Sequence, residues 1–133
     1  MPERLRSLGA WESFDASELT RSLIELLHND SACLLVAENS GRLVGFVEVY
    51  LRKDEPHPAR VAYTYAHMQS LMMAAGWRKR GIGKRLVMAA ERWARKQGAA
   101  EVRLDTWEFP GHPVQFYEQL GYQTMKRELM RRL

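Results

Sequence analysis

The residues best suited to chemistry lie together in one basic segment, Arg78-Lys79-Arg80-Gly81-Ile82-Gly83-Lys84-Arg85. This segment holds five of the 20 basic residues and none of the 16 acidic residues, so the net charge of +4 is concentrated here. Its two glycines have no Cβ and let backbone N–H groups approach an anion closely. A helix that begins at this point adds unpaired N–H groups and the positive end of its dipole. The segment therefore predicts a cradle for a small polyanion, such as the phosphates of a cofactor.

Two common phosphate motifs do not describe this segment. The nucleotide P-loop needs a second glycine followed by Lys and then Ser or Thr, and that sequence is absent. The dinucleotide fingerprint needs a third glycine and an acidic residue after the next strand, which is a different pattern. The alternative interpretation of the same residues is an ordinary solvated basic turn.

Hydrophobic periodicity predicts the elements that must position the basic segment. A long strand leads directly into it, and an amphipathic helix follows it and ends where Gly98 can act as a C-terminal cap. Further upstream, Asp15 and Glu18 form a capping box for a first helix, and an Asn-Ser-Gly turn joins two strands into a hairpin. The predicted order is helix, three strands, helix, strand, helix and strand, a single α/β domain after a loose leader over residues 1–14. The elements are expected at residues 15–28, 32–37, 42–52, 61–73, 82–97, 101–107, 114–120 and 122–131.

The composition excludes several classes of protein. The 133 residues suit one domain, and 46% hydrophobic with 27% charged residues is a globular balance. No apolar run approaches the ~20 residues that cross a bilayer, and the first residues show no signal-peptide pattern. The single cysteine, Cys33, excludes an internal disulfide and a multi-cysteine zinc site. We therefore expect a cytoplasmic protein with no metal and no membrane association. A nucleic-acid partner is not expected, because no recognition helix or aromatic platform accompanies the basic segment.

Two further segments accompany the basic one in a fixed order along the chain. Residues 116–122 read Phe-Tyr-Glu-Gln-Leu-Gly-Tyr and begin 38 residues after Arg78, and residues 36–46 read as two strands with their turn. The basic segment is similar to the Arg/Gln-x-x-Gly-x-Gly/Ala signature of the GCN5-related N-acetyltransferases, the GNAT superfamily. Residues 116–122 resemble the family's Phe-Tyr-x-x-x-Gly-Phe/Tyr segment, and residues 36–46 resemble its second and third strands. The resemblance extends over about residues 16–131.

The resemblance implies a fold and a co-substrate. The fold is a mixed, mostly antiparallel central sheet flanked by helices (α+β), in which the strand before the glycine loop splays away from its neighbour. The co-substrate is acetyl-CoA, whose pyrophosphate is held by the backbone amides of the loop and whose pantetheine arm pairs with the splayed strand. By position, the expected cofactor-binding residues are Leu71, Met73, Arg78, Lys79, Arg80, Gly81, Ile82, Gly83, Lys84 and Phe116.

The reaction that the resemblance implies is a direct attack of a primary amine on the thioester carbonyl, without an acyl-enzyme. Tyr117 matches the family tyrosine that acts as general acid to the departing thiolate. His67, where some members carry a catalytic Glu or His, and Glu108 are expected as candidates for the general base, with Glu48 as a further rival. His112 could instead contact the substrate, and a water chain could replace a dedicated base.

Several features leave the function open within this family. Pro110 stands where the family often has a cofactor-contacting Asn, and Pro113 stands where it often has Ala. The N-terminal region is short, whereas many members begin with a strand of their own and two helices that form part of the acceptor site, so a second subunit could cover the gap. The final segment, residues 126–133, offers an exposed edge, and a homodimer is expected. The leading interpretation is an N-acetyltransferase whose acceptor is a small-molecule amine rather than a protein, attracted by acids such as Asp105. The alternative is a non-catalytic domain on the same fold that binds acetyl-CoA or CoA.

Overall fold

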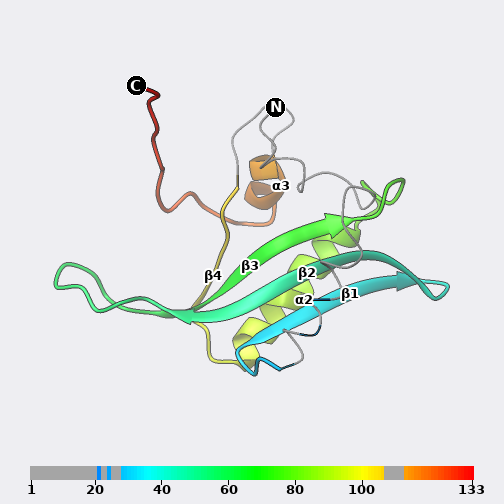
Figure 1. Ribbon diagram of the computed structural model, residues 1–133, viewed down its shortest axis with the longest axis horizontal. Coiled ribbons are helices and arrows are strands. Elements are labelled where there is room, and N and C mark those ends of the chain that lie inside the picture. Colours follow the sequence, from blue (N-terminus) through cyan, green and yellow to red (C-terminus); the bar gives the residue numbers. More distant parts are fainter. Residues whose placement is uncertain (1–20, 22–23, 25–27, 107–112) are drawn as a thin grey trace.

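A computed structural model of the chain describes residues 21, 24, 28–106 and 113–133 (Figure 1). The helix predicted from Asp15 falls almost entirely outside the described residues, and only Arg21 and Ile24 are seen as helical. The expected leader over residues 1–14 lies outside them as well. In the part of the chain that the structure describes, no helix is long and apolar enough to cross a bilayer.

Four strands form one mixed sheet whose spatial order follows the sequence. They are β1 (Ala32–Asn39), β2 (Arg42–Lys53), β3 (Thr64–Met73) and β4 (Glu101–Arg103). The first two pairs of neighbours are antiparallel, whereas β3 and β4 are parallel. Two helices, α2 (Ile82–Lys96) and α3 (Pro113–Gln119), complete the framework, and α2 lies across one face of the sheet (Figure 1). The expected mixed, mostly antiparallel sheet flanked by helices is confirmed.

The connection between β1 and β2 is the tight turn that the sequence predicts. Ser40 and Gly41 both have positive φ angles, of 50° and 78°. Two successive residues of this kind match the right-handed twist of the strands that they join. Asn39 and Arg42 are the last residues that pair across the turn.

The main core lies between the sheet and α2. The helix begins after Gly81 and ends at Lys96, and Gly98, with a φ of 80°, completes the C-terminal turn as predicted. Its apolar residues repeat at helical spacing and pack against alternate residues of β2 and β3. The buried members of this cluster are Val47, Val49, Ala66, Met68, Leu86, Val87, Ala90 and Ala94. The opposite face of the sheet is also buried in part, because Phe46 and Met72 are only 1% and 2% exposed.

The parallel pair β3 and β4 is in contact over only three residues of each strand. Tyr65, Ala66 and His67 pair with Glu101, Val102 and Arg103. After His67, β3 continues to Met73 and pairs with β2 alone among the described strands. Figure 1 shows β4 leaving β3 along this second half. The splayed strand before the glycine segment is therefore present.

A bulge interrupts β3 within this unaccompanied half. Phe46 pairs with Met72 and Glu48 with Gln69, so one residue of β2 faces two residues of β3. Ser70 takes up the extra residue with a φ of 58°, a left-handed conformation that is uncommon outside glycine. After the bulge Leu71 and Met73 pack against the core cluster on the α2 side.

Three strand predictions need correction. The strand predicted from Val61 begins at Thr64, because Tyr63 and Asp54 instead close the β2–β3 connection through two hydrogen bonds. The strand predicted to reach residue 107 ends at Arg103, where the pairing with β3 stops. The closing strand predicted over residues 122–131 is wrong, since this segment is irregular and Leu129 and Met130 are 89% and 77% exposed. Figure 1 shows the segment running away from the sheet, so its alternating apolar residues have no surface to cover.

Candidate functional site

The basic segment forms a tight loop at the start of α2. Gly81 is the N-cap residue with φ 80° and ψ 2°, and Lys79 also has a positive φ of 60°. Left-handed residues placed among right-handed ones turn successive N–H groups toward one side and form an anion-binding concavity. Within the described part of the chain, no side-chain hydrogen bond caps the start of α2, and the first turn of this helix contains no acidic residue. The leading N–H groups of a helix have no partner within the helix itself. The five basic side chains of the segment, Arg78, Lys79, Arg80, Lys84 and Arg85, are exposed.

The two glycines of the segment have different roles. A Cβ at Gly81 would meet nothing within 4 Å, so this residue combines a left-handed backbone with open space above it. A Cβ at Gly83, in contrast, would lie 3.3 Å from Phe116 Cζ and 3.4 Å from Met73 Cε. Gly83 is buried and lets side chains from α3 and from the end of β3 pack against the first turn of α2. The sequence predicts that both glycines lie at the anion, and the structure shows in addition that Gly83 is a packing position.

The loop is attached to the sheet and stiffened by stacking. Ala74, directly after β3, donates its N–H to Val44 O, and Trp77 donates its N–H to Ala74 O. The guanidinium carbon of Arg80 lies 4.7 Å from the centroid of the Trp77 ring, which is a cation–π contact. The expected residues from Leu71 to Lys84 therefore follow one another from the splayed part of β3 to the start of α2.

α3 brings an aromatic cluster to the same place. Phe116 packs against Gly83, and its ring makes an edge contact with Tyr117 at a centroid distance of 5.0 Å. Tyr117 in turn contacts the Tyr122 ring at 5.8 Å, and the Tyr122 hydroxyl donates a hydrogen bond of 2.8 Å to Glu91 Oε2 on α2. Burial raises the pKa of Tyr117 to about 12, so its phenol keeps its proton at neutral pH.

His67 lies on the other face of the sheet, at the last pair of β3 and β4. Its neighbours along the strand, Ala66 and Met68, belong to the core on the α2 side, so His67 points away from α2. His67 Nε2 lies 3.3 Å from Asp105 Oδ2, while its buried Nδ1 has no hydrogen-bond partner among the residues that the structure describes. The side chain of His67 is 15% exposed and that of Asp105 is 85% exposed.

The other two candidates for a base are Glu48, which the structure describes, and Glu108, which it does not. Glu48 is 7% exposed and pairs with Gln69 across β2 and β3, so it lies on the same face as His67. Glu108 and His112 lie outside the described residues, as does Pro110. The structure therefore brings His67 and Asp105 into contact and Phe116 to the glycine loop. It leaves Glu108 without a described position.

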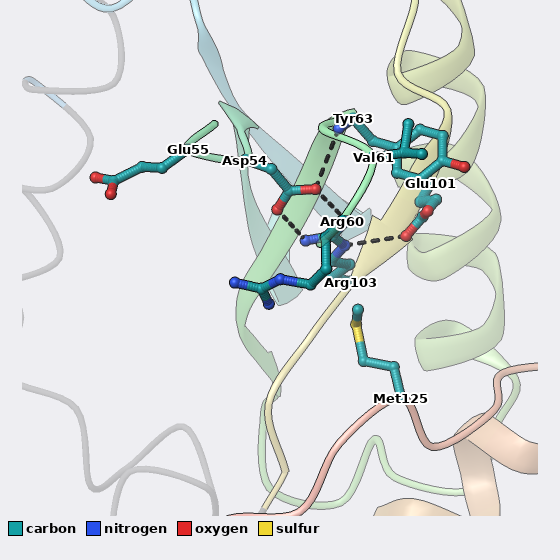
Figure 2. A pocket seen from close by; sticks show the side chains of 8 residues that line it. All are labelled: Asp54, Glu55, Arg60, Val61, Tyr63, Glu101, Arg103 and Met125. Carbon is teal, nitrogen blue, oxygen red and sulfur yellow. Dashed lines mark hydrogen bonds and ion pairs between the residues drawn. The ribbon is translucent and has the colours of Figure 1, made fainter. Parts of the chain in front are cut away.

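The structure also contains an ion cluster that the sequence did not indicate. Arg103 donates hydrogen bonds of 2.7 and 2.9 Å to the two oxygens of Asp54 and one of 3.0 Å to Glu101 Oε2 (Figure 2). Its guanidinium carbon also lies 3.9 Å from the centroid of the Tyr65 ring. The cluster borders a cleft of about 380 Å³, where Met125 of the C-terminal segment approaches Arg103. Asp54 and Arg103 are 49 residues apart in the sequence, so no local pattern could have paired them.

The cleft is separate from the glycine loop. Its walls come from the β2–β3 connection, β4 and Met125, whereas the glycine loop follows the other end of β3. The described residues include no group of three His, Cys, Asp or Glu side chains that could hold a metal ion. Anion binding at the loop and proton transfer at Tyr117 and His67 stay predictions from the sequence.

A sheet with a diverging parallel pair, followed by an anion-binding loop at a helix start, defines a class of phosphate-binding α/β domain. Comparison with known families is more specific: the profile of the Acetyltransferase (GNAT) family matches residues 5–122. The chain belongs to this family.

Characterised relatives match over part of their own length. N-acetyltransferase family 8 member 3 of Rattus norvegicus is 30% identical over 117 residues, which are 85% of this chain and 50% of that protein. An aminoglycoside N(6')-acetyltransferase type 1 of Stenotrophomonas maltophilia is 30% identical over 101 residues, 74% of this chain and 63% of that protein. The chain therefore spans between half and two thirds of these relatives.

Solved structures share the fold. AAC(6')-Iy in complex with the bisubstrate analog CoA-S-monomethyl-acetylneamine superposes with a TM-score of 0.76, at 21% identity, over 92% of this chain and 83% of that one. A transcriptional regulator from Bacillus halodurans C-125 superposes with a TM-score of 0.73, at 24% identity, over 88% of this chain and 76% of that one. At these identities the likeness establishes the fold.

Proposed function

We propose that this chain is an acetyl-CoA-dependent N-acetyltransferase that transfers an acetyl group to a primary amine by direct attack. The observation that carries the proposal is the loop at Gly81, where a left-handed N-cap, open space and an uncapped helix start coincide. The loop directly follows β3, whose second half no longer pairs with β4. An anion bound at the loop would therefore lie close to an edge of β3 that has no described partner strand. Membership of the GNAT family supports the same function.

The residues of the loop and of β3 would hold acetyl-CoA along this surface. The N–H groups around Gly81 and the first turn of α2 would bind the pyrophosphate, and the exposed basic side chains would add charge. The backbone of Leu71 and Met73 would pair with the pantetheine arm, because β3 has no described neighbour on that edge. At ~3.3 Å per residue, β3 extends roughly 20 Å back from Met73 to His67, so an extended arm would point toward the described proton-transfer residues.

Tyr117 would serve the leaving group. Its raised pKa of about 12 keeps the phenol protonated, so the hydroxyl can donate a hydrogen bond to the sulfur as negative charge develops there. His67 would serve the amine, because imidazole ordinarily titrates near neutral pH and can accept the ammonium proton. Glu48 stays a second candidate on the same face, and Glu108 stays a prediction outside the described residues.

The acceptor that we favour is a small-molecule amine. The named aminoglycoside N(6')-acetyltransferase relatives support this class, as does the complex of AAC(6')-Iy with a CoA–acetylneamine analog. We further infer a homodimer formed through the C-terminal segment, whose large apolar residues stand exposed. Cytoplasmic location stays a prediction from the sequence.

The proposal is tested by isothermal titration of the protein with acetyl-CoA, CoA and ATP, followed by thiol release in the presence of a panel of amines. We expect micromolar binding of acetyl-CoA and CoA but not of ATP, and turnover with at least one amine. Tyr117→Phe should lower kcat about 100-fold and leave the affinity for CoA unchanged. Tyr63→Phe is the matched control, since Tyr63 is exposed on the β2–β3 connection and should behave as the parent protein. If none of the three ligands binds, the proposal that this chain is an acetyl-CoA-dependent enzyme is refuted.

The second candidate function is a non-catalytic domain that binds acetyl-CoA. It predicts the same titration result for acetyl-CoA and CoA, no thiol release with any amine, and no effect of Tyr117→Phe. The absence of turnover with intact binding would favour this alternative.

A further inference from the structure

Trp77 and Arg80 form a stacked pair in the loop that precedes α2. The guanidinium carbon of Arg80 lies 4.7 Å from the centroid of the Trp77 ring. Trp77 is half-buried and donates its N–H to Ala74 O, and Ala74 donates its own N–H to Val44 O on β2. Arg80 is exposed. The indole is therefore an anchored surface on which the flexible arginine side chain lies.

Stacking on the indole leaves the hydrogen-bonding edge of Arg80 unused. A guanidinium stacks through its flat face, whereas its N–H donors lie in its plane and point outward. Among the residues that the structure describes, no carboxylate forms an ion pair with Arg80. The next acidic residue along the chain, Glu91, accepts a hydrogen bond from Tyr122. Arg80 thus presents its charge and its donors to solvent.

Arg103 shows how this protein completes a stacked arginine where carboxylates are near. Its guanidinium carbon lies 3.9 Å from the centroid of the Tyr65 ring, so its face is also covered by an aromatic side chain. Its in-plane donors are taken by the two oxygens of Asp54 and by Glu101. Arg80 has the same kind of stacking ring without a described carboxylate. Its edge therefore suits an anion that comes from outside the protein.

The position of Arg80 places this edge at the start of α2. Arg80 directly precedes the N-cap residue Gly81, and consecutive Cα atoms lie about 3.8 Å apart. An arginine edge can hold two phosphate oxygens at once, which a lysine cannot do. Because the stacked side chain is already restricted, less conformational entropy is lost when it binds an anion.

We propose that Trp77 is a positioning residue that holds the Arg80 guanidinium for a bidentate contact with a diphosphate, which in the proposed function is that of acetyl-CoA. The inference rests on that function and adds Trp77 to the residues expected to bind the cofactor. Its basis is the stacked contact together with the unused edge of the same guanidinium.

The first test observes the stacked contact without any ligand. In protein labelled with ¹⁵N-arginine, the ring current of Trp77 should displace the Nε–H signal of Arg80, with Arg80→Gln providing the assignment. Trp77→Leu should abolish the displacement and Trp77→Phe should keep part of it. Arg52 is an internal reference, because it lies 5.7 Å from the centroid of the Tyr50 ring and should not respond. An Arg80 signal that is the same in Trp77→Leu would overturn the proposal.

The second test measures whether Trp77 acts through Arg80. Isothermal titration with acetyl-CoA and with inorganic pyrophosphate should show both affinities lowered about 5-fold by Trp77→Leu and about 10-fold by Arg80→Gln. Trp77→Phe should restore most of the affinity. In the Arg80→Gln background, Trp77→Leu should cause no further loss, whereas independent losses would overturn the positioning role. Arg52→Gln is the matched control, because it removes the same charge beside the start of β3, where Arg52 pairs with Tyr65.

The two ligands separate this inference from the function on which it rests. If the parent protein binds pyrophosphate with this pattern but does not bind acetyl-CoA, the enzyme is refuted and the role of Trp77 is retained. If acetyl-CoA binds and its affinity is unchanged in Arg80→Gln, the role of Trp77 is refuted and the enzyme is retained. If neither ligand binds, both are refuted.

Discussion

The two glycines that flank α2 allow the anion cradle to be tested apart from its contribution to stability. Gly81 precedes the helix and Gly98 follows it, both have a φ of 80°, and a Cβ at either position would meet nothing within 4 Å. Alanine at either site therefore causes no clash. It does have to adopt a left-handed conformation, which costs an L-residue roughly 1–2 kcal/mol. Alanine also reduces the conformational freedom of the unfolded chain, which stabilises the folded state by about 0.4–1 kcal/mol.

The expected net destabilisation is the same for both variants, at about 1 kcal/mol. For 133 residues the unfolding entropy is about 0.28 kcal/mol/K, so each variant should lower Tm by about 4 °C. Their effects on acetyl-CoA should differ. Gly81→Ala places a methyl group in the open space of the cradle, and we expect its affinity for acetyl-CoA to fall at least 10-fold. Gly98→Ala should bind acetyl-CoA as the parent protein does.

The assays are thermal unfolding for stability and isothermal titration for acetyl-CoA affinity. Two results would refute the reasoning. If Gly81→Ala binds acetyl-CoA normally, the open space at Gly81 is not the anion site. If Gly98→Ala loses as much affinity as Gly81→Ala, the loss reflects weakening of the helix. A Tm that rises in either variant would contradict the left-handed conformation at that position.

Three further predictions concern stability. Gly83→Val should destabilise the protein by about 1–3 kcal/mol in urea unfolding, because its side chain would overlap Phe116; an unchanged midpoint would contradict this contact. The pKa of Asp54 is lowered from 3.8 to about 2, chiefly by hydrogen bonds from Arg103. The folded state therefore binds fewer protons than the unfolded state, and this contribution is present above about pH 4 and lost as the pH falls toward 2. Asp54→Asn should remove that part of the dependence of Tm on acid pH. If Tm of the variant and Tm of the parent protein change with pH in the same way, this prediction is refuted. Val87→Ala should cost about 2 kcal/mol, since Val87 is 1% exposed between α2 and the sheet; a loss below about 0.5 kcal/mol would show that the core closes over the gap.

Elements with a local signal were predictable from the sequence. The Asn-Ser-Gly turn needs two left-handed residues in succession, and the glycine pattern at residues 81–83 places the start of α2 correctly. The helix itself has a clear apolar repeat and a glycine at its end. The turn that leads into α2 also depends on neighbouring residues, so its place was apparent from the sequence, and its role as an anion cradle stays a prediction.

Features that depend on distant partners were not predictable. The strand expected over residues 122–131 has suitable alternation, but a strand also needs a neighbouring strand to pair with, and sequence alternation does not supply one. β4 is short because its pairing with β3 stops at Arg103. The contact between His67 and Asp105 joins residues 38 apart, so the sequence could name both residues without pairing them.

The bulge at Ser70 lets β3 hold one extra residue without changing which side chains face the core. Side chains alternate along a strand, and the extra residue shifts that alternation by one, which turns Leu71 and Met73 toward α2 and Met72 toward Phe46. Deletion of Ser70 would leave a regular ladder in which these three side chains keep their faces. It would remove the bend and the added twist that a bulge gives to its strand. A deletion of this one residue would therefore change the direction in which β3 enters the glycine loop more than it would change the core.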